Sequence, residues 1–152
     1  MLGLGGSAGH ASHATNDFRK LCAIEAYCPS DNVSELTARI NDEGFDSIYS
    51  AWLDVSRLGE RDCLLFFSVG GGSRDRKISL PLVAAADFAK SRRSSILSIV
   101  GRSSGELVPL SDACIVLQSD DDLRTPVTEG LTAVVWHMLV SHPALQTRAT
   151  KW

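Results

Sequence analysis

The first helix expected in the chain carries ionisable side chains directly behind a glycine-rich turn. Residues 3–9 contain four glycines and Ser7, and His13 and Asp17 follow at a spacing of four. That spacing places both side chains on one face of a helix, which His10 shares. Unpaired N–H groups at a helix start attract anions, and glycines let an oxyanion approach the backbone. The sequence therefore predicts a phosphate site and a metal-binding or proton-transferring cluster on one element.

A second glycine-rich loop, 70–73, follows the apolar run 62–68 at once. Neither loop has a dinucleotide or triphosphate fingerprint, because the chain lacks both a full GxGxxG after a strand and GxxxxGK[ST]. Hydroxyl-rich loops without an obligatory lysine suit a sugar phosphate better than a nucleoside triphosphate, so no nucleotide cofactor is expected. Taken alone, residues 70–72 are equally explained as a flexible turn.

Hydrophobic spacing predicts the elements that position these loops. In the first third of the chain we expect a helix over 8–21, a short strand over 23–28 stopped by Pro29, and a helix after Ser30 and Asp31, which are capping residue types. A further helix over 45–56 places its apolar side chains on one face; they are Phe45, Ile48, Tyr49, Trp52 and Val55.

The remainder alternates between buried strands and helices. Strands are predicted at 62–68, 96–101 and 113–117, and helices at 80–91 and 128–141. This alternation implies a parallel sheet in an α/β sandwich, with ligands bound beyond the carboxyl ends of the strands.

The composition describes an ordinary globular chain. With 152 residues, 44% hydrophobic and 22% charged, it suits a single domain. A net charge of −3 gives no basic footprint for nucleic acid, and no apolar run is long enough to span a membrane. Without a signal-peptide pattern, we expect a cytoplasmic protein. The cysteines at 22, 28, 63 and 114 lack CxxC spacing and are interpreted as small buried hydrophobes.

Four ordered blocks, at residues 4–13, 41–42, 67–76 and 128–139, together resemble the sugar isomerase (SIS) domain. The closer likeness is to the phosphoheptose isomerases, which convert sedoheptulose 7-phosphate into D-glycero-D-manno-heptose 7-phosphate for surface polysaccharides. The resemblance implies a three-layer αβα sandwich over residues 1–152. It also implies a homotetramer, or a dimer, with active sites between subunits.

The resemblance also implies which residues bind the phosphosugar. Ser7, Ser68 and Ser73 match hydroxyl positions of the family, Val69 lies between them in the second loop, and Gly70 stands where another serine is usual. Backbone N–H groups can replace the lost hydroxyl. By resemblance Asp42 faces the substrate, although Asn41-Asp42 before Glu43-Gly44 is also explained as a turn signal.

The catalytic pair implied by the family is Asp17 and His137. Members that bind zinc suggest His13, Asp17, Glu129 and His137 as ligands here. Asp17 is one methylene shorter than the family's glutamate, and Glu129 replaces a glutamine. Without the resemblance, His137 would be interpreted as a core histidine, and Glu129 as a first-turn residue favoured by the helix dipole.

Two expectations follow from these departures. The family places a helix and a buried strand before the first loop, so a shortened sheet is expected, with residues 1–6 poorly supported at its edge. The shorter Asp17 keeps a second function open, that of a non-catalytic SIS module which binds a phosphosugar and regulates or scaffolds a partner.

Overall fold

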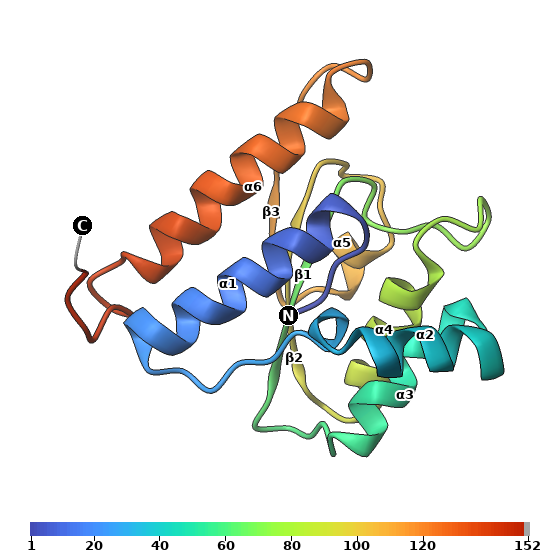
Figure 1. Cartoon of the computed structure of the whole chain (residues 1–152). Coiled ribbons are helices and arrows are strands. Elements are labelled where there is room, and N and C mark those ends of the chain that lie inside the picture. Colours follow the sequence, from blue (N-terminus) through green and yellow to red (C-terminus); the bar gives the residue numbers. More distant parts are fainter. Residues whose placement is uncertain (151–152) are drawn as a thin grey trace.

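The computed structural model describes residues 1–150, which form a parallel sheet between two layers of helices (Figure 1). The helices are α1 (Gly6–Cys22), α2 (Val33–Asp42), α3 (Ile48–Val55), α4 (Leu80–Ser91), α5 (Leu107–Leu110) and α6 (Arg124–Val140). The strands are β1 (Cys63–Ser68), β2 (Ser95–Val100) and β3 (Ala113–Val116), and 3-10 turns occur at Pro29–Asp31 and Phe45–Ser47. In this part of the chain, no helix is long and apolar enough to cross a membrane.

The strands pair in the order β1-β2-β3, all parallel, which confirms the predicted α/β architecture. Leu65 aligns with Leu97 and Phe67 with Ile99, and Ile99 in turn aligns with Ile115. This register brings the carboxyl ends of all three strands to one edge, where the glycine-rich loops emerge.

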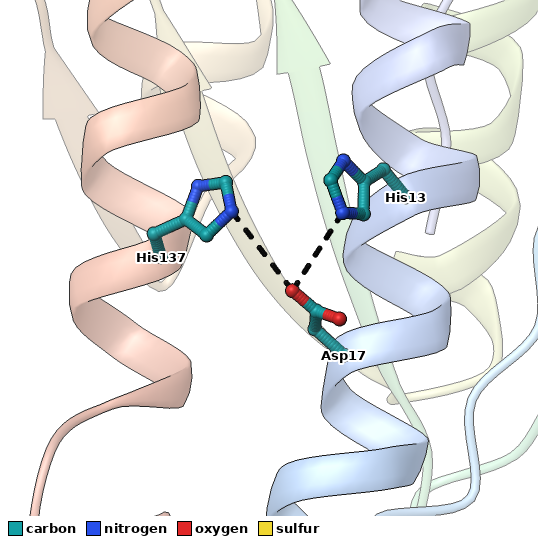
Figure 2. Close-up of side chains that lie close together, drawn as sticks. All are labelled: His13, Asp17 and His137. Atoms are coloured by element: carbon teal, nitrogen blue, oxygen red, sulfur yellow. Dashed lines mark ion pairs between the residues drawn. The ribbon is translucent and has the colours of Figure 1, made fainter. Parts of the chain in front are cut away.

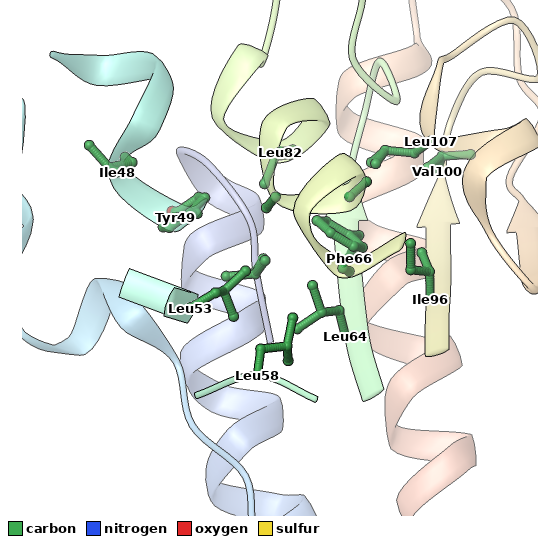
Figure 3. Close-up of a cluster of buried hydrophobic side chains, with 14 residues drawn as sticks. Ile48, Tyr49, Leu53, Leu58, Leu64, Phe66, Leu82, Ile96, Val100 and Leu107 are labelled. Atoms are coloured by element: carbon green, nitrogen blue, oxygen red, sulfur yellow. The ribbon is translucent and has the colours of Figure 1, made fainter. Parts of the chain in front are cut away.

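Alternation along β1 divides the core between the two faces of the sheet. Leu64 and Phe66 point into a cluster with α3, α4 and α5 (Figure 3), whereas Leu65 and Phe67 point into a second cluster with α1 and α6. Successive strand side chains face opposite sides, so a strand covered on both faces must be apolar throughout. The second cluster fixes α1 against α6, the two helices that carry the candidate site.

Residues before α1 are held more firmly than expected. Leu2 forms a parallel bridge with Phe66, in which Leu2 N–H donates to Leu65 and Phe67 N–H donates to Leu2, both at 2.9 Å. The Tyr49 hydroxyl donates to the Gly3 carbonyl at 2.6 Å, and burial raises the pKa of Tyr49 to about 12. The expectation of poor support at this edge is therefore wrong, because backbone pairing and a buried phenol anchor it.

Several local predictions differ from the structure. The strand expected over 23–28 is irregular: Ala23 ends α1 in the left-handed conformation, and Ile24 and Tyr27 are exposed. Asn32, not Ser30 or Asp31, caps α2 by accepting from Glu35 N–H.

The structure also differs from the prediction at both ends of the apolar face expected over 45–56. Phe45 lies in a 3-10 turn before α3, and Phe45 and Val55 are both exposed, whereas Leu53 is buried. The predicted burial of the cysteines is confirmed for Cys22 and Cys28. It is wrong for Cys63, which is exposed at the start of β1, and Cys114 is half-buried.

Candidate active site

Helices α1 and α6 lie side by side and bring three ionisable side chains together (Figure 2). His13 and Asp17 project from successive turns of α1, and His137 projects toward them from α6. One ligand atom from each of the three lies within 4.8 Å of the others. Residues 120 positions apart in the chain thus form one cluster.

Asp17 is the buried centre of this cluster. Its Oδ2 lies 3.8 Å from His13 Nε2 and 3.9 Å from His137 Nε2, while Oδ1 accepts a 2.8 Å hydrogen bond from Asn16 Nδ2. The Asp17 side chain is 5% exposed, against 59% and 49% for the two histidines. Both separations exceed a hydrogen bond, so an atom bound between the nitrogens and the carboxylate could contact all three groups.

A backbone contact determines the tautomer of neutral His137. Its Nδ1 lies 2.7 Å from the Ala133 carbonyl, which can only accept, so Nδ1 carries the proton. In the neutral ring, Nε2 is then unprotonated and directs its lone pair toward Asp17 Oδ2 (Figure 2). Two electron-rich atoms facing each other favour a cation or a proton between them.

Trp136 packs against both histidines, a role that sequence reasoning did not assign to it. Its ring stacks on His137 with centroids 3.5 Å apart and meets His13 edge-on at 4.7 Å. Trp136 is 1% exposed. No spacing rule links Trp136 to His13, because that contact crosses from α6 to α1.

Glu129 lies apart from the three clustered side chains. A Cβ built on Gly6 would lie 2.4 Å from Glu129 Oε1, so this carboxylate occupies the space beside the first turn of α1. Among the described residues, the group that could hold a metal consists of His13, Asp17 and His137 only. Glu129 instead faces the end of α1 that carries positive partial charge.

The loop after β1 uses its serines to hold its own shape. The buried Ser68 hydroxyl accepts from Gly71 N–H at 3.0 Å, and the Ser73 hydroxyl accepts from Arg76 N–H at 3.3 Å. Ser73 also pairs with Ile78 through two backbone hydrogen bonds. Each hydroxyl can still donate its proton to an oxyanion. Val69 and Gly70 are half-buried between the serines.

A close backbone contact fixes this loop against the loop after β2. Gly71 and Gly105 approach so closely that a Cβ on Gly105 would lie 2.6 Å from Gly71 Cα. Glu106 N–H donates to Gly72 and Leu107 N–H donates to Gly71, at 3.1 and 2.9 Å. The loop after β1 is therefore held in place by the loop after β2 and is not a free turn.

The structure brings Ser7 and Ser68 to the same sheet edge but leaves Asp42 apart. Leu2 and Phe66 pair in parallel, so Ser7 in the first turn of α1 and Ser68 at the end of β1 both follow the paired segments at the same edge. Asp42 ends α2, exposed to solvent, where it accepts from the Asn41 side chain at 2.7 Å. Its helix packs against α3, away from α1 and α6 in Figure 1.

The fold is that of solved phosphoheptose isomerases. The structure of the enzyme from Neisseria gonorrhoeae superposes with a TM-score of 0.77 at 24% identity, covering 92% of this chain and 72% of that one. The enzyme from Francisella tularensis gives 0.74 at 22% identity, covering 91% and 71%. These likenesses show that the chain shares the fold of those enzymes. No protein-family model matches the sequence.

Sequence comparison gives the family. The phosphoheptose isomerase of Helicobacter pylori (strain ATCC 700392 / 26695) is 30% identical over 91% of this chain and 70% of its own length. This chain belongs to the phosphoheptose isomerase family. The lincomycin biosynthesis protein LmbN of Streptomyces lincolnensis is 36% identical over 92% of this chain, and the chain spans 54% of the length of that relative.

Proposed function

We propose that this chain is a sugar-phosphate isomerase that interconverts sedoheptulose 7-phosphate and D-glycero-D-manno-heptose 7-phosphate. The observation that carries the proposal is the approach of His137 Nε2 to 3.9 Å from Asp17 Oδ2, which lies on a helix that begins at the first glycine-rich loop. Membership of the phosphoheptose isomerase family supports the choice of a seven-carbon ketose phosphate. We propose a cytoplasmic role in supplying heptose for surface polysaccharide, from a single SIS domain that needs no nucleotide cofactor, nucleic acid or membrane.

The reaction needs two groups that exchange protons. One base removes a proton from C1 of the ketose and returns it to C2, while the second group moves a proton from the C1 oxygen to the C2 oxygen. The neutral imidazole of His137 offers an unprotonated Nε2, and the Asp17 carboxylate offers Oδ2. The two atoms are close enough to serve adjacent carbons and their oxygens.

The phosphate group would be held at the sheet edge. Ser7 and the loop containing Ser68, Val69, Gly70 and Ser73 supply hydroxyls and backbone N–H groups, and the start of α1 favours negative charge. Glu129 beside Gly6 is placed to accept hydrogen bonds from sugar hydroxyls. From the family arrangement we also propose that Asp42 faces the substrate, although α2, which carries it, lies apart from the cluster.

Incubation with sedoheptulose 7-phosphate, followed by NMR, tests this function. Appearance of the aldose signal is the expected result, with fructose 6-phosphate as the control for chain length. Saturable binding without turnover would instead identify the non-catalytic phosphosugar-binding module. Absence of both would contradict the proposal.

The same cluster fits a divalent cation, and we propose Zn²⁺. His13 and His137 present Nε2 to a buried carboxylate, a donor set that zinc accepts. Glu129 is the fourth residue proposed from the family pattern, but its carboxylate lies beside Gly6 and would have to turn toward the cluster. A bound Zn²⁺ would polarise the substrate carbonyl as a Lewis acid.

Zinc affinity is expected to depend on His13 and not on His10. His13→Ala removes a ligand and should weaken Zn²⁺ binding at least about 10- to 100-fold, whereas His10→Ala on the same helix is the matched control. Calorimetry measures the affinity of both variants, and tryptophan fluorescence, to which Trp136 beside the ion contributes, gives a second readout. Equal affinities for the two variants would refute the assignment.

An exposed apolar row on α6 supports assembly with a second copy of the chain. Leu131, Val134 and Met138 recur at helical spacing and are 41%, 52% and 67% exposed. Val134, His137 and Met138 also line one shallow depression, so the row borders the cluster. We propose that this face is the subunit interface of a dimer or tetramer and that the active site lies beside it.

Met138→Lys is expected to produce monomers and to lower turnover, because it places a charge in the proposed interface. Light scattering coupled to size exclusion measures the mass. Val33→Lys on α2, where the apolar side chain is 65% exposed, is the control and should leave the assembly unchanged. A monomeric wild type, or a Met138→Lys variant of unchanged mass, would exclude this interface.

A further inference from the structure

A polar pocket lies beyond the carboxyl ends of β2 and β3, outside the candidate active site. Its volume is about 300 Å³, and its side chains come from Arg102, Ser103, Ser104, Gln118, Ser119 and Arg124. The pocket lining contains no aromatic or aliphatic side chain, and Gly101, its remaining residue, contributes only backbone. In a parallel sheet this edge is where ligands bind, yet these residues take no part in the proposed isomerase chemistry.

Two guanidinium groups lie in the wall of the pocket. Arg124 is 14% exposed and donates to the Gly101 carbonyl at 3.0 Å, which holds it in place; its buried Nε has no hydrogen-bond partner among residues 1–150. Arg102 is one-third exposed, and its ion pair with Asp121 is loose at 3.8 Å. Arg124 is thus held in place, whereas Arg102 keeps N–H donors available at the mouth of the pocket.

The charged side chains that line the pocket are both cationic, which favours an anion. Arg102 and Arg124 line it, whereas Asp121, which pairs with both, and its neighbours Asp120 and Asp122 do not. Asp121 itself is 78% exposed and lies on the surface loop that precedes α6, so an incoming anion can displace it from Arg102. The hydroxyls of Ser103 and Ser104, which also line the pocket, add hydrogen-bond donors.

The pocket chemistry also limits the ligand class. Guanidinium and hydroxyl donors match the oxygens of a phosphate group. A nucleobase needs an aromatic or apolar surface to stack on, and the lining offers none. The volume is at the small end of ligand pockets. A small phosphorylated metabolite fits these constraints better than a nucleotide.

Backbone geometry separates this pocket from the proposed active site. Residues 101–104 form part of its wall, and Gly105, the next residue in the chain, contacts Gly71 in the loop after β1. Gly101 N–H also donates to Val69, in the loop that carries Ser68 and Ser73. A ligand here would not touch Asp17 or His137, but it would contact the wall that adjoins the loop after β1.

We propose that this pocket is a second anion site, which binds the phosphate group of a small metabolite or free inorganic phosphate through Arg102, Arg124 and the hydroxyls of Ser103 and Ser104. The site is independent of isomerase activity, because none of these side chains belongs to the catalytic cluster. A ligand bound in this site would adjoin the segment 101–105, which contacts the loop after β1.

Phosphate titration followed by amide and arginine Nε NMR signals tests the proposal in the full chain. Inorganic phosphate should shift the signals of 101–104 and Arg124 saturably, and Arg102→Gln should weaken that binding about tenfold. Arg93→Gln, which removes an exposed arginine paired with Glu60, is the control. Ser103→Asp adds a repelling charge while both arginines remain, and should abolish the shifts.

A second titration with sedoheptulose 7-phosphate distinguishes the source of the phosphate group. Tighter binding of the sugar ester at 101–104 would identify a phosphorylated metabolite, and equal binding would identify phosphate alone. Shifts confined to Ser7 and 68–73 would overturn the second site while leaving the isomerase proposal intact. Equal affinity of Arg102→Gln and the wild type would also overturn it.

Discussion

Replacement of Asp17 by asparagine is expected to lower turnover of sedoheptulose 7-phosphate by about 100- to 10,000-fold, the contribution of one acid–base group. The change is nearly isosteric, and the buried side chain can still accept from Asn16 through its oxygen. It removes the charge that both histidines face, so proton transfer fails while the helix pair remains packed. Turnover measured by NMR, together with a thermal melt, separates lost chemistry from lost folding.

Two further variants make this result specific. Asp46→Asn, in the exposed 3-10 turn before α3, should retain most activity if the cluster of α1 and α6 is the catalytic centre. Asp17→Glu moves the carboxylate outward by more than about 1 Å, a displacement to which proton transfer is sensitive. Unchanged turnover in Asp17→Asn would exclude Asp17 from the reaction.

Gly105→Ala is expected to damage the active site from a distance. The added Cβ would lie 2.6 Å from both the Gly70 carbonyl oxygen and Gly71 Cα, and these backbone atoms cannot move without shifting the loop of Ser68 and Ser73. We expect a loss of about 1 to 3 kcal/mol in unfolding free energy, as in overpacked cores, and a KM for the phosphosugar raised about tenfold or more.

Gly130→Ala is the matched control for that experiment. Gly130 lies on the exposed side of α6, where a Cβ would meet nothing within 4 Å. Alanine there should stabilise the helix by about 0.5 to 1 kcal/mol. Because Gly130 is one turn before Val134 in the proposed interface, the KM comparison uses Gly59→Ala, where a Cβ would meet nothing closer than 3.8 Å and KM should be unchanged. Denaturant unfolding and steady-state kinetics measure both quantities. A Gly105→Ala variant with wild-type KM would show that the contact does not position the loop.

The sheet and its flanking helices could be predicted from the sequence because their signals are local. The apolar run of β1 and the helical spacing of α1, α4 and α6 depend on burial, which repeats along each element. The segment 23–28 shows the limit of this reasoning. It is apolar enough to suggest a strand, but a strand exists only where a neighbouring strand pairs with it. Here the Tyr27 and Ala26 carbonyls accept instead from the Met1 amino group and the Arg19 guanidinium.

The candidate site could be predicted only where a motif preserved its spacing. His13 and Asp17 are one helical turn apart, so their shared face follows from the sequence, whereas the approach of His137 came from the family resemblance. The side-chain direction of Glu129 and the packing of Trp136 between two histidines depend on how α1 and α6 cross. Spacing along one element carries no information about that crossing.

The pairing of α1 with α6 has a consequence for the order of folding. Cys22 contacts Val140, and the backbone N–H groups of Thr147 and Arg148 donate to the Leu21 carbonyl, so the first helix, which also packs on β1, gains its partner helix only when the last part of the chain is present. Contacts of such long sequence separation require a large loop to close and therefore form slowly. During synthesis the sheet and α4 can assemble early, whereas the cluster of His13, Asp17 and His137 becomes complete only after α6 has left the ribosome.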